Sequence, residues 1–85
     1  MRIERLFARI VRGDAGNIAF VDLVRIVEAL GFSEIGGRGS HRVFAHPAVA
    51  ELINLQAEAG QAKRYQVRQV ASLIRRYDLR LEGRR

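Results

Sequence analysis

The ten residues from Arg38 to Pro47 constrain this chain more than any other stretch, because they hold both of its histidines and its only proline. Three of the four positions 36–39 are glycine, which lets the backbone adopt positive φ angles and approach a ligand closely. From His41 to Ala45 the pattern has the two-residue period of a strand, which we expect to end at the proline. The stretch therefore predicts a glycine loop that delivers Ser40 and His41 to the start of a strand.

Two amphipathic helices are expected ahead of this loop. Apolar residues at positions 3, 6, 7 and 10 have helical spacing and predict an N-terminal helix over residues 2–12, within a first segment of residues 1–13. A second helix is predicted from about Phe20 to Leu30, where Gly31 supplies a left-handed stop. Both apolar stripes indicate packing against a core rather than chemistry.

Three strands and a closing helix are expected in the rest of the chain. Strands are predicted over residues 32–35, 40–45 and 52–56, although the periodicity also permits a helix over 48–56. Residues 57–63 predict a loop, residues 65–79 a helix, and residues 83–85 a frayed basic tail. The expected fold is α+β, in one domain over residues 1–85 with the order α-α-β-β-β-α. A three-stranded antiparallel sheet with helices packed on one face is the economical arrangement.

The charge of the chain points to an anionic partner. Lys and Arg together number 15 against 9 Asp and Glu, and the net charge of +6 arises entirely after residue 35. Most of these cations are arginine, whose guanidinium forks onto phosphate and stacks on bases. The pattern favours nucleic acid or an acidic protein over a merely solvated surface.

Other functional classes are disfavoured by the composition. No segment approaches the ~18 apolar residues of a membrane span, so we expect no membrane partner. The chain has no cysteine, which excludes disulfides and thiolate metal sites and is compatible with a cytoplasmic location.

His41 is the candidate catalytic residue. An imidazole exchanges protons near neutral pH, and RNA carries its own nucleophile in the 2′-hydroxyl. Cleavage then needs a proton acceptor and nearby cations, which Arg38, Lys63 and Arg64 are expected to supply. Backbone amides of the glycine loop are expected to receive a phosphate oxygen. The alternative is that His41 only hydrogen-bonds the loop.

His46 is not expected to act together with His41. The two are five residues apart, and side chains in a strand alternate between faces, so an odd separation places them on opposite sides unless a bulge intervenes. The same argument disfavours a shared metal site, and we expect neither a metal nor another cofactor. A structural or solvent-exposed role is expected for His46.

The predicted RNA-binding residues surround His41 in the sequence or lie near the last helix. They are Arg38, Gly39, Ser40, Arg42, Lys63, Arg64 and Arg68. Among the aromatic residues, Phe44 is assigned to the core, whereas Tyr65 is left undecided between packing and stacking on a base.

A family resemblance rests on three short motifs, namely Gly31-Phe32, Gly39-Ser40-His41 and Val43-Phe44. In this order they resemble the HicA (YcfA-like) family of small mRNA interferase toxins, which are paired with HicB antitoxins. The likeness runs from about Phe20 to Leu79, and the helix over residues 2–12 is similar to that of the longer members. The resemblance implies a fold like a double-stranded-RNA-binding domain, His41 as the catalytic histidine, and an acidic HicB-like partner.

One departure from the family pattern affects the functional hypothesis. Shorter members carry Pro-x-His in the third strand, and residues 51–56 contain neither residue. The leading hypothesis is a metal-independent endoribonuclease toxin that cleaves mRNA through His41. The alternatives are a non-catalytic RNA-binding module and a protein-interaction subunit on the same fold.

Overall fold

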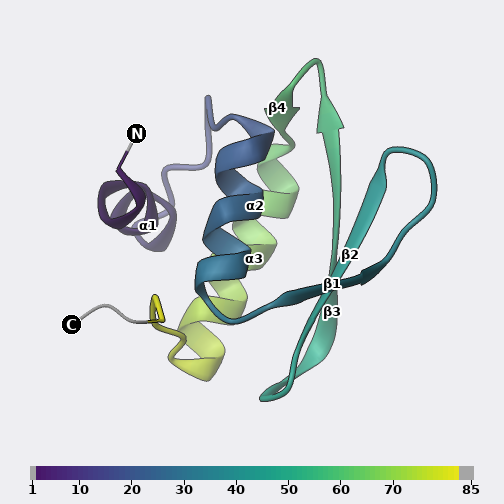
Figure 1. The fold of residues 1–85 in the computed structure, drawn as a ribbon. Coiled ribbons are helices and arrows are strands. Elements are labelled where there is room, and N and C mark those ends of the chain that lie inside the picture. Colours follow the sequence, from purple (N-terminus) through teal and green to yellow (C-terminus); the bar gives the residue numbers. More distant parts are fainter. Residues whose placement is uncertain (1, 83–85) are drawn as a thin grey trace.

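The computed structural model describes residues 2–82 and confirms an α+β fold (Figure 1). The predicted tail at residues 83–85 lies outside the described residues. In chain order the elements are α1 (Ile3–Val11), α2 (Phe20–Ala29), β1 (Ser33–Gly36), β2 (His41–His46), β3 (Val49–Glu58), β4 (Gln61–Ala62) and α3 (Arg64–Tyr77). The order is therefore α-α-β-β-β-β-α, and the prediction of three strands was wrong by one.

The sheet is antiparallel with the strand order β1-β2-β3-β4. Figure 1 shows all three helices on one side of it, with α2 and α3 beside the sheet and α1 beyond them. This arrangement confirms the prediction that the helices cover one face. The opposite face, called the outer face below, has no helix over it among the described elements.

Strand β3 settles the ambiguity of residues 48–56 in favour of a strand. Ile53 and Leu55 are buried, whereas Leu52 and Asn54, which alternate with them, are exposed. This two-residue period belongs to a sheet with one covered face. The helical alternative was wrong, and the strand is longer than the predicted residues 52–56 because it pairs with β2 and then with β4.

Strand β4 occupies part of the predicted loop over residues 57–63. Ala59 and Gly60 both have positive φ angles, of 51° and 79°, which is the geometry of a tight two-residue hairpin turn. Such turns favour Asn or Asp at the first position, so an alanine there gave no turn signal in the sequence. Gln61 and Ala62 then pair with the end of β3.

The hairpin also holds the start of α2. The amide of Phe20 donates to the carbonyl of Gly60 at 3.0 Å, and that of Ala62 donates to the carbonyl of Ile18 at 2.8 Å. The helix has no side-chain cap, and the contact of Phe20 satisfies one of the amides that its first turn leaves without an intrahelical partner.

The hydrophobic core lies between the sheet and the helices. Its fully buried side chains come from every layer and include Leu6, Ile10, Leu23, Val27, Phe44, Ile53, Leu55, Val67 and Val70. The predicted apolar stripes of the helices and the assignment of Phe44 to the core are thus confirmed. Within residues 2–82, no helix is both long enough and apolar enough to span a bilayer.

Candidate functional site

The glycine loop shapes the approach to β2. Gly37 has a φ angle of 144°, and a side chain there would overlap the carbonyl oxygen of His41. Gly39 also has a positive φ angle, of 63°, and the amide of His41 donates to the carbonyl of Arg38 at 3.1 Å. The loop therefore folds back on itself and places Ser40 and His41 at the start of the strand, as the sequence predicted.

His41 lies exposed on the outer face of the sheet. It is opposite Gln56 of β3, and its Nδ1 lies 3.3 Å from Oδ1 of Asn54. Because an amide oxygen only accepts hydrogen bonds, this contact requires the hydrogen on Nδ1, and in the neutral ring Nε2 then carries the lone pair. The imidazole is thereby oriented with one nitrogen held and the other available to a proton donor.

A chain of polar side chains joins the loop to α3 beside His41. Nε2 of Gln56 donates to Oγ of Ser40 at 3.0 Å, and Nζ of Lys63 donates to Oε1 of Gln56 at 3.1 Å. Oε1 of the buried Gln66 accepts a hydrogen bond from the backbone amide of Gln56 at 3.1 Å, which fixes β3 against α3. These contacts bring the cationic Lys63 into the same polar cluster as Ser40. We call Ser40, His41, Asn54, Gln56 and Lys63 the outer-face cluster.

Sequence reasoning missed Asn54, Gln56 and Gln66. A signal for the first two was present, because Ile53 and Leu55 were assigned to one face and the residues alternating with them must lie on the other. Their contacts also depend on the register between β2 and β3, which contains an irregularity between Phe44 and His46. The irregularity changes which residues of β2 and β3 lie opposite each other, and it cannot be predicted from the spacing of residues in the sequence.

Arg42 lies on the helix-covered side of β2, away from His41. Its guanidinium donates two hydrogen bonds to Glu34, at 2.9 and 2.7 Å, and lies 5.6 Å from the ring centre of Phe44. The hydrogen bond from Arg42 lowers the pKa of Glu34, and the same contact raises the pKa of Arg42. The predicted RNA-binding role of Arg42 therefore competes with a pair that is already formed.

His46 has a structural environment. Its ring lies edge-on to Phe32 with the centroids 5.0 Å apart, and its Nδ1 accepts the amide of Ala48 at 3.0 Å. Phe32 is buried, so His46 faces the core side whereas His41 faces outward. The odd spacing thus places the two imidazoles on opposite faces, as expected.

The other predicted cations fall into two regions. Arg38 is exposed in the loop beside the outer-face cluster. Arg64 and Arg68 line a hollow of about 500 Å³ between α3 and the loop that follows α1, together with Arg9, Gly13, Asp14, Ala15, Gly16 and Asn17. The structure therefore separates Arg64 and Arg68 from Lys63, their neighbour in the sequence.

Tyr65 is 62% exposed at the start of α3, and its hydroxyl accepts a hydrogen bond from Gln66 at 3.2 Å. Its ring is therefore not part of the core. An exposed aromatic ring two residues from Lys63 has the chemistry to stack on a base while the ammonium holds a phosphate.

The described residues 2–82 contain no cluster of three or more His, Asp or Glu side chains that could hold a metal ion. The outer-face cluster instead combines one imidazole, one ammonium, a hydroxyl and two amides. Such a set can transfer a proton and hold an anion.

Comparison with known proteins adds no assignment, because no family model, curated protein or solved structure matches this chain.

Proposed function

We propose that this chain is a metal-independent endoribonuclease that cuts mRNA through His41, the toxin of a HicA-type toxin–antitoxin pair. The observation that carries the proposal is the exposed imidazole of His41, held at Nδ1 by Asn54 and flanked by Ser40, Gln56 and Lys63. This placement on an open sheet face suits a long polymer better than a small molecule.

The chemistry requires only groups that the outer-face cluster contains. Nε2 of His41 takes the proton of a 2′-hydroxyl, and the 2′-oxygen attacks the adjacent phosphorus. The bond from phosphorus to the 5′-oxygen breaks, and that oxygen takes a proton from solvent. The products are a 2′,3′-cyclic phosphate and a 5′-hydroxyl end, and a positioned base of this kind contributes about 10²- to 10⁴-fold in rate.

Charge stabilisation comes from the residues beside the imidazole. Lys63 is within reach of a phosphate that approaches the cluster, and Arg38 is exposed in the loop two residues before Ser40. The amides of the glycine loop add donors that need no reorganisation. Tyr65 offers a stacking surface for a neighbouring base.

An acidic antitoxin is the expected protein partner. The described part of the sheet has exposed apolar side chains at Ile35 and Leu52, together with the cations of the cluster. A partner with carboxylates around an apolar centre would cover this face and exclude RNA from His41.

The test compares the two histidines of β2. Purified full-length protein is incubated with single-stranded RNA in a metal chelator, and the ends of the fragments are analysed. We expect cyclic phosphate ends, a loss of about 10²-fold or more for His41→Ala, and full activity for the control His46→Asn. Undiminished cutting by His41→Ala would falsify the assignment of the catalytic residue.

A second candidate function is a non-catalytic RNA-binding module. It is favoured by the single imidazole on the outer face, since no second histidine is there to protonate the leaving group. In that case RNA binds with a steep salt dependence but stays intact in the same assay, for the parent chain and for His41→Ala alike.

A further inference from the structure

The hollow between α3 and the loop that follows α1 has no role in the proposed cleavage. Arg64 and Arg68 lie one helical turn apart along its wall, and neither guanidinium has a hydrogen-bonded or ionic partner within residues 2–82. Two adjacent, uncompensated guanidiniums repel each other, so an anion between them is favourable. We call this hollow the arginine cleft.

The other charges in the arginine cleft are already satisfied. Arg9 donates to Oδ2 of Asp14 at 3.1 Å and to the carbonyl of Gly16 at 2.6 Å. The hydrogen bond from Arg9 lowers the pKa of Asp14, so this carboxylate stays ionised and paired at neutral pH. Arg9 and Asp14 thus fix the loop and leave the charge of Arg64 and Arg68 in excess.

Gly16 lines the arginine cleft next to the guanidinium of Arg64. A Cβ atom at Gly16 would lie 3.3 Å from Nη2 of Arg64, which is tighter than ordinary contact. The guanidinium therefore packs over a position where a side chain would displace it. The planar fork of a guanidinium matches the geometry of a phosphate group, to which it can donate two parallel hydrogen bonds.

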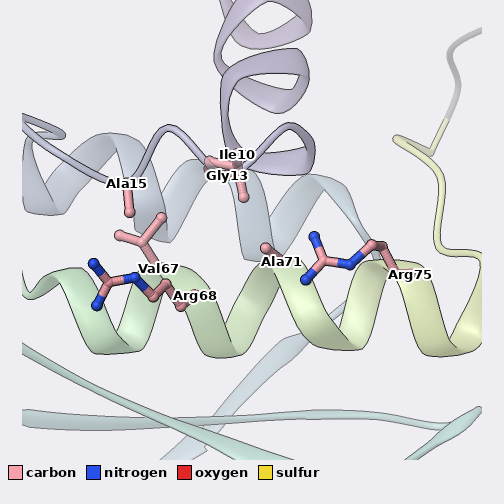
Figure 2. A pocket seen from close by; sticks show the side chains of 7 residues that line it. All are labelled: Ile10, Gly13, Ala15, Val67, Arg68, Ala71 and Arg75. Carbon is pink, nitrogen blue, oxygen red and sulfur yellow. The ribbon is translucent and has the colours of Figure 1, made fainter.

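A third arginine on α3 provides an internal contrast. Nη1 of Arg75 donates to the carbonyl of Val11 at 3.2 Å, so this side chain ties α3 to the end of α1. Figure 2 shows Arg68 and Arg75 on the same side of α3, with Ala71 between them and Val67 next to Arg68, below the end of α1. Of the two, only Arg68 is free to bind a ligand.

Position links the arginine cleft to the proposed active site. Lys63 belongs to the outer-face cluster and Arg64 to the cleft, so consecutive residues at the start of α3 serve the two sites. The first turn of α3 contains no acidic residue, and the positive end of the helix dipole adds to the positive charge of both sites. A flexible polyanion that crosses this helix end passes from one site to the other.

We infer that the arginine cleft binds the phosphates of a single-stranded RNA segment that lies beyond the segment cut at His41. The inference rests on the proposed function for the identity of the strand. The continuity through Lys63 and Arg64 favours a polymer of phosphates over an acidic peptide. The cleft then acts as an anchor that makes long strands bind more tightly than short ones.

The test measures binding at named arginines in the full chain. Side-chain Nε–H signals of arginine are followed by NMR during titration with a twelve-nucleotide single-stranded DNA, which lacks the 2′-hydroxyl and is not cut. We expect the signals of Arg64 and Arg68 to shift, and those of Arg25 and Arg80 to stay in place. A poly-glutamate of equal charge should shift them less, and an equal shift would overturn the choice of phosphate.

Matched variants test the anchor with RNA. Arg64→Gln/Arg68→Gln should weaken binding of a twelve-nucleotide strand at least tenfold and reduce the salt slope by about 1.4, since each phosphate contact contributes about 0.7. Cleavage of a dinucleotide should not change. The control Arg25→Gln/Arg80→Gln removes the same charge from exposed side chains that pair with aspartates elsewhere. An equal loss of binding in the control would overturn the inference, as would loss of dinucleotide cleavage in the cleft variant.

These readouts separate the inference from the proposed function. Arginine signals that shift in a protein that cuts no RNA support the cleft and overturn the nuclease. RNA that is cut while Arg64 and Arg68 stay unperturbed supports the nuclease and overturns the cleft.

Discussion

The two imidazoles of β2 lie on one short strand and have opposite surroundings. His41 is exposed, with Asn54 near one ring nitrogen. His46 lies against the ring of Phe32, and its Nδ1 accepts the amide of Ala48. The residue type is the same at both positions, so the difference in role comes from the face of the sheet.

The comparison indicates that an imidazole is a candidate for proton transfer only when one ring nitrogen is held by a hydrogen bond and the other is accessible to a ligand. The outer face provides both conditions at His41. The helix-covered face uses the imidazole of His46 as a packing and capping group. Four predictions, ordered by the size of the expected effect, test this contrast.

The largest effect is expected for Gly37→Ala. The positive φ angle and the overlap of a methyl group with the carbonyl of His41 should destabilise the fold by about 2 kcal/mol or more and displace the imidazole. Thermal unfolding and RNA cleavage measure the two effects. The control is Gly36→Ala, because a Cβ there meets no atom within 4 Å. Equal behaviour of the two variants would contradict the backbone argument.

A smaller effect is expected for His46→Ala. Loss of the ring contact with Phe32 and of the acceptor for the Ala48 amide should lower the free energy of unfolding by about 1–2 kcal/mol. Cleavage per folded molecule should not change. His46→Asn, which keeps an acceptor near the same place, should recover part of the loss. A cleavage defect in either variant at full folding would remove the contrast between the two histidines.

Asn54 should affect the reaction but not the fold. Asn54→Ala removes the acceptor for Nδ1 of His41, and we expect about a tenfold lower rate, equivalent to about 1.4 kcal/mol, with little change in thermal stability. Asn54→Asp should favour the protonated imidazole and move the pH–rate profile to higher pH. An unchanged profile in Asn54→Asp would show that this contact does not orient the imidazole of His41.

The smallest effect is expected for Glu34→Gln on the opposite face. The hydrogen bond from Arg42 lowers the pKa of Glu34, so the contribution of this pair to stability is present above the unfolded-state pKa and lost as the pH falls through the folded-state pKa. The parent chain should therefore exceed the variant in stability above about pH 5 and converge with it in acid. Urea unfolding between pH 2 and 7 measures this. A difference that grows toward low pH would contradict the sign.

Local patterns predicted the elements of this fold well where the apolar period was long. The stripes of α2 and α3 and the alternation of Ile53 and Leu55 each indicated the correct element and its buried face. The fourth strand was missed because its two residues have no period of their own. Its turn places Ala59, rather than a typical turn residue, at a positive φ angle.

The outer-face cluster was predictable only where its residues are neighbours in the sequence. The sequence contains His41 and its glycine loop as one local unit, so their proximity follows from the chain. The contacts of His41 with Asn54 and of Ser40 with Gln56 join residues 13 and 16 positions apart, and Lys63 contacts Gln56 from the start of α3. They depend on the strand register and on the packing of α3, which no local pattern specifies.

The contacts of β4 with the start of α2 have a consequence for synthesis on the ribosome. The backbone groups of Ile18 and Phe20 form hydrogen bonds with Ala62 and Gly60, which are synthesised about forty residues later. Lys63 and Gln66, which complete the polar cluster around β3, emerge later still. A nascent chain therefore has to expose α3 before either the helical layer or the outer-face cluster can assemble, and truncated translation products should lack both.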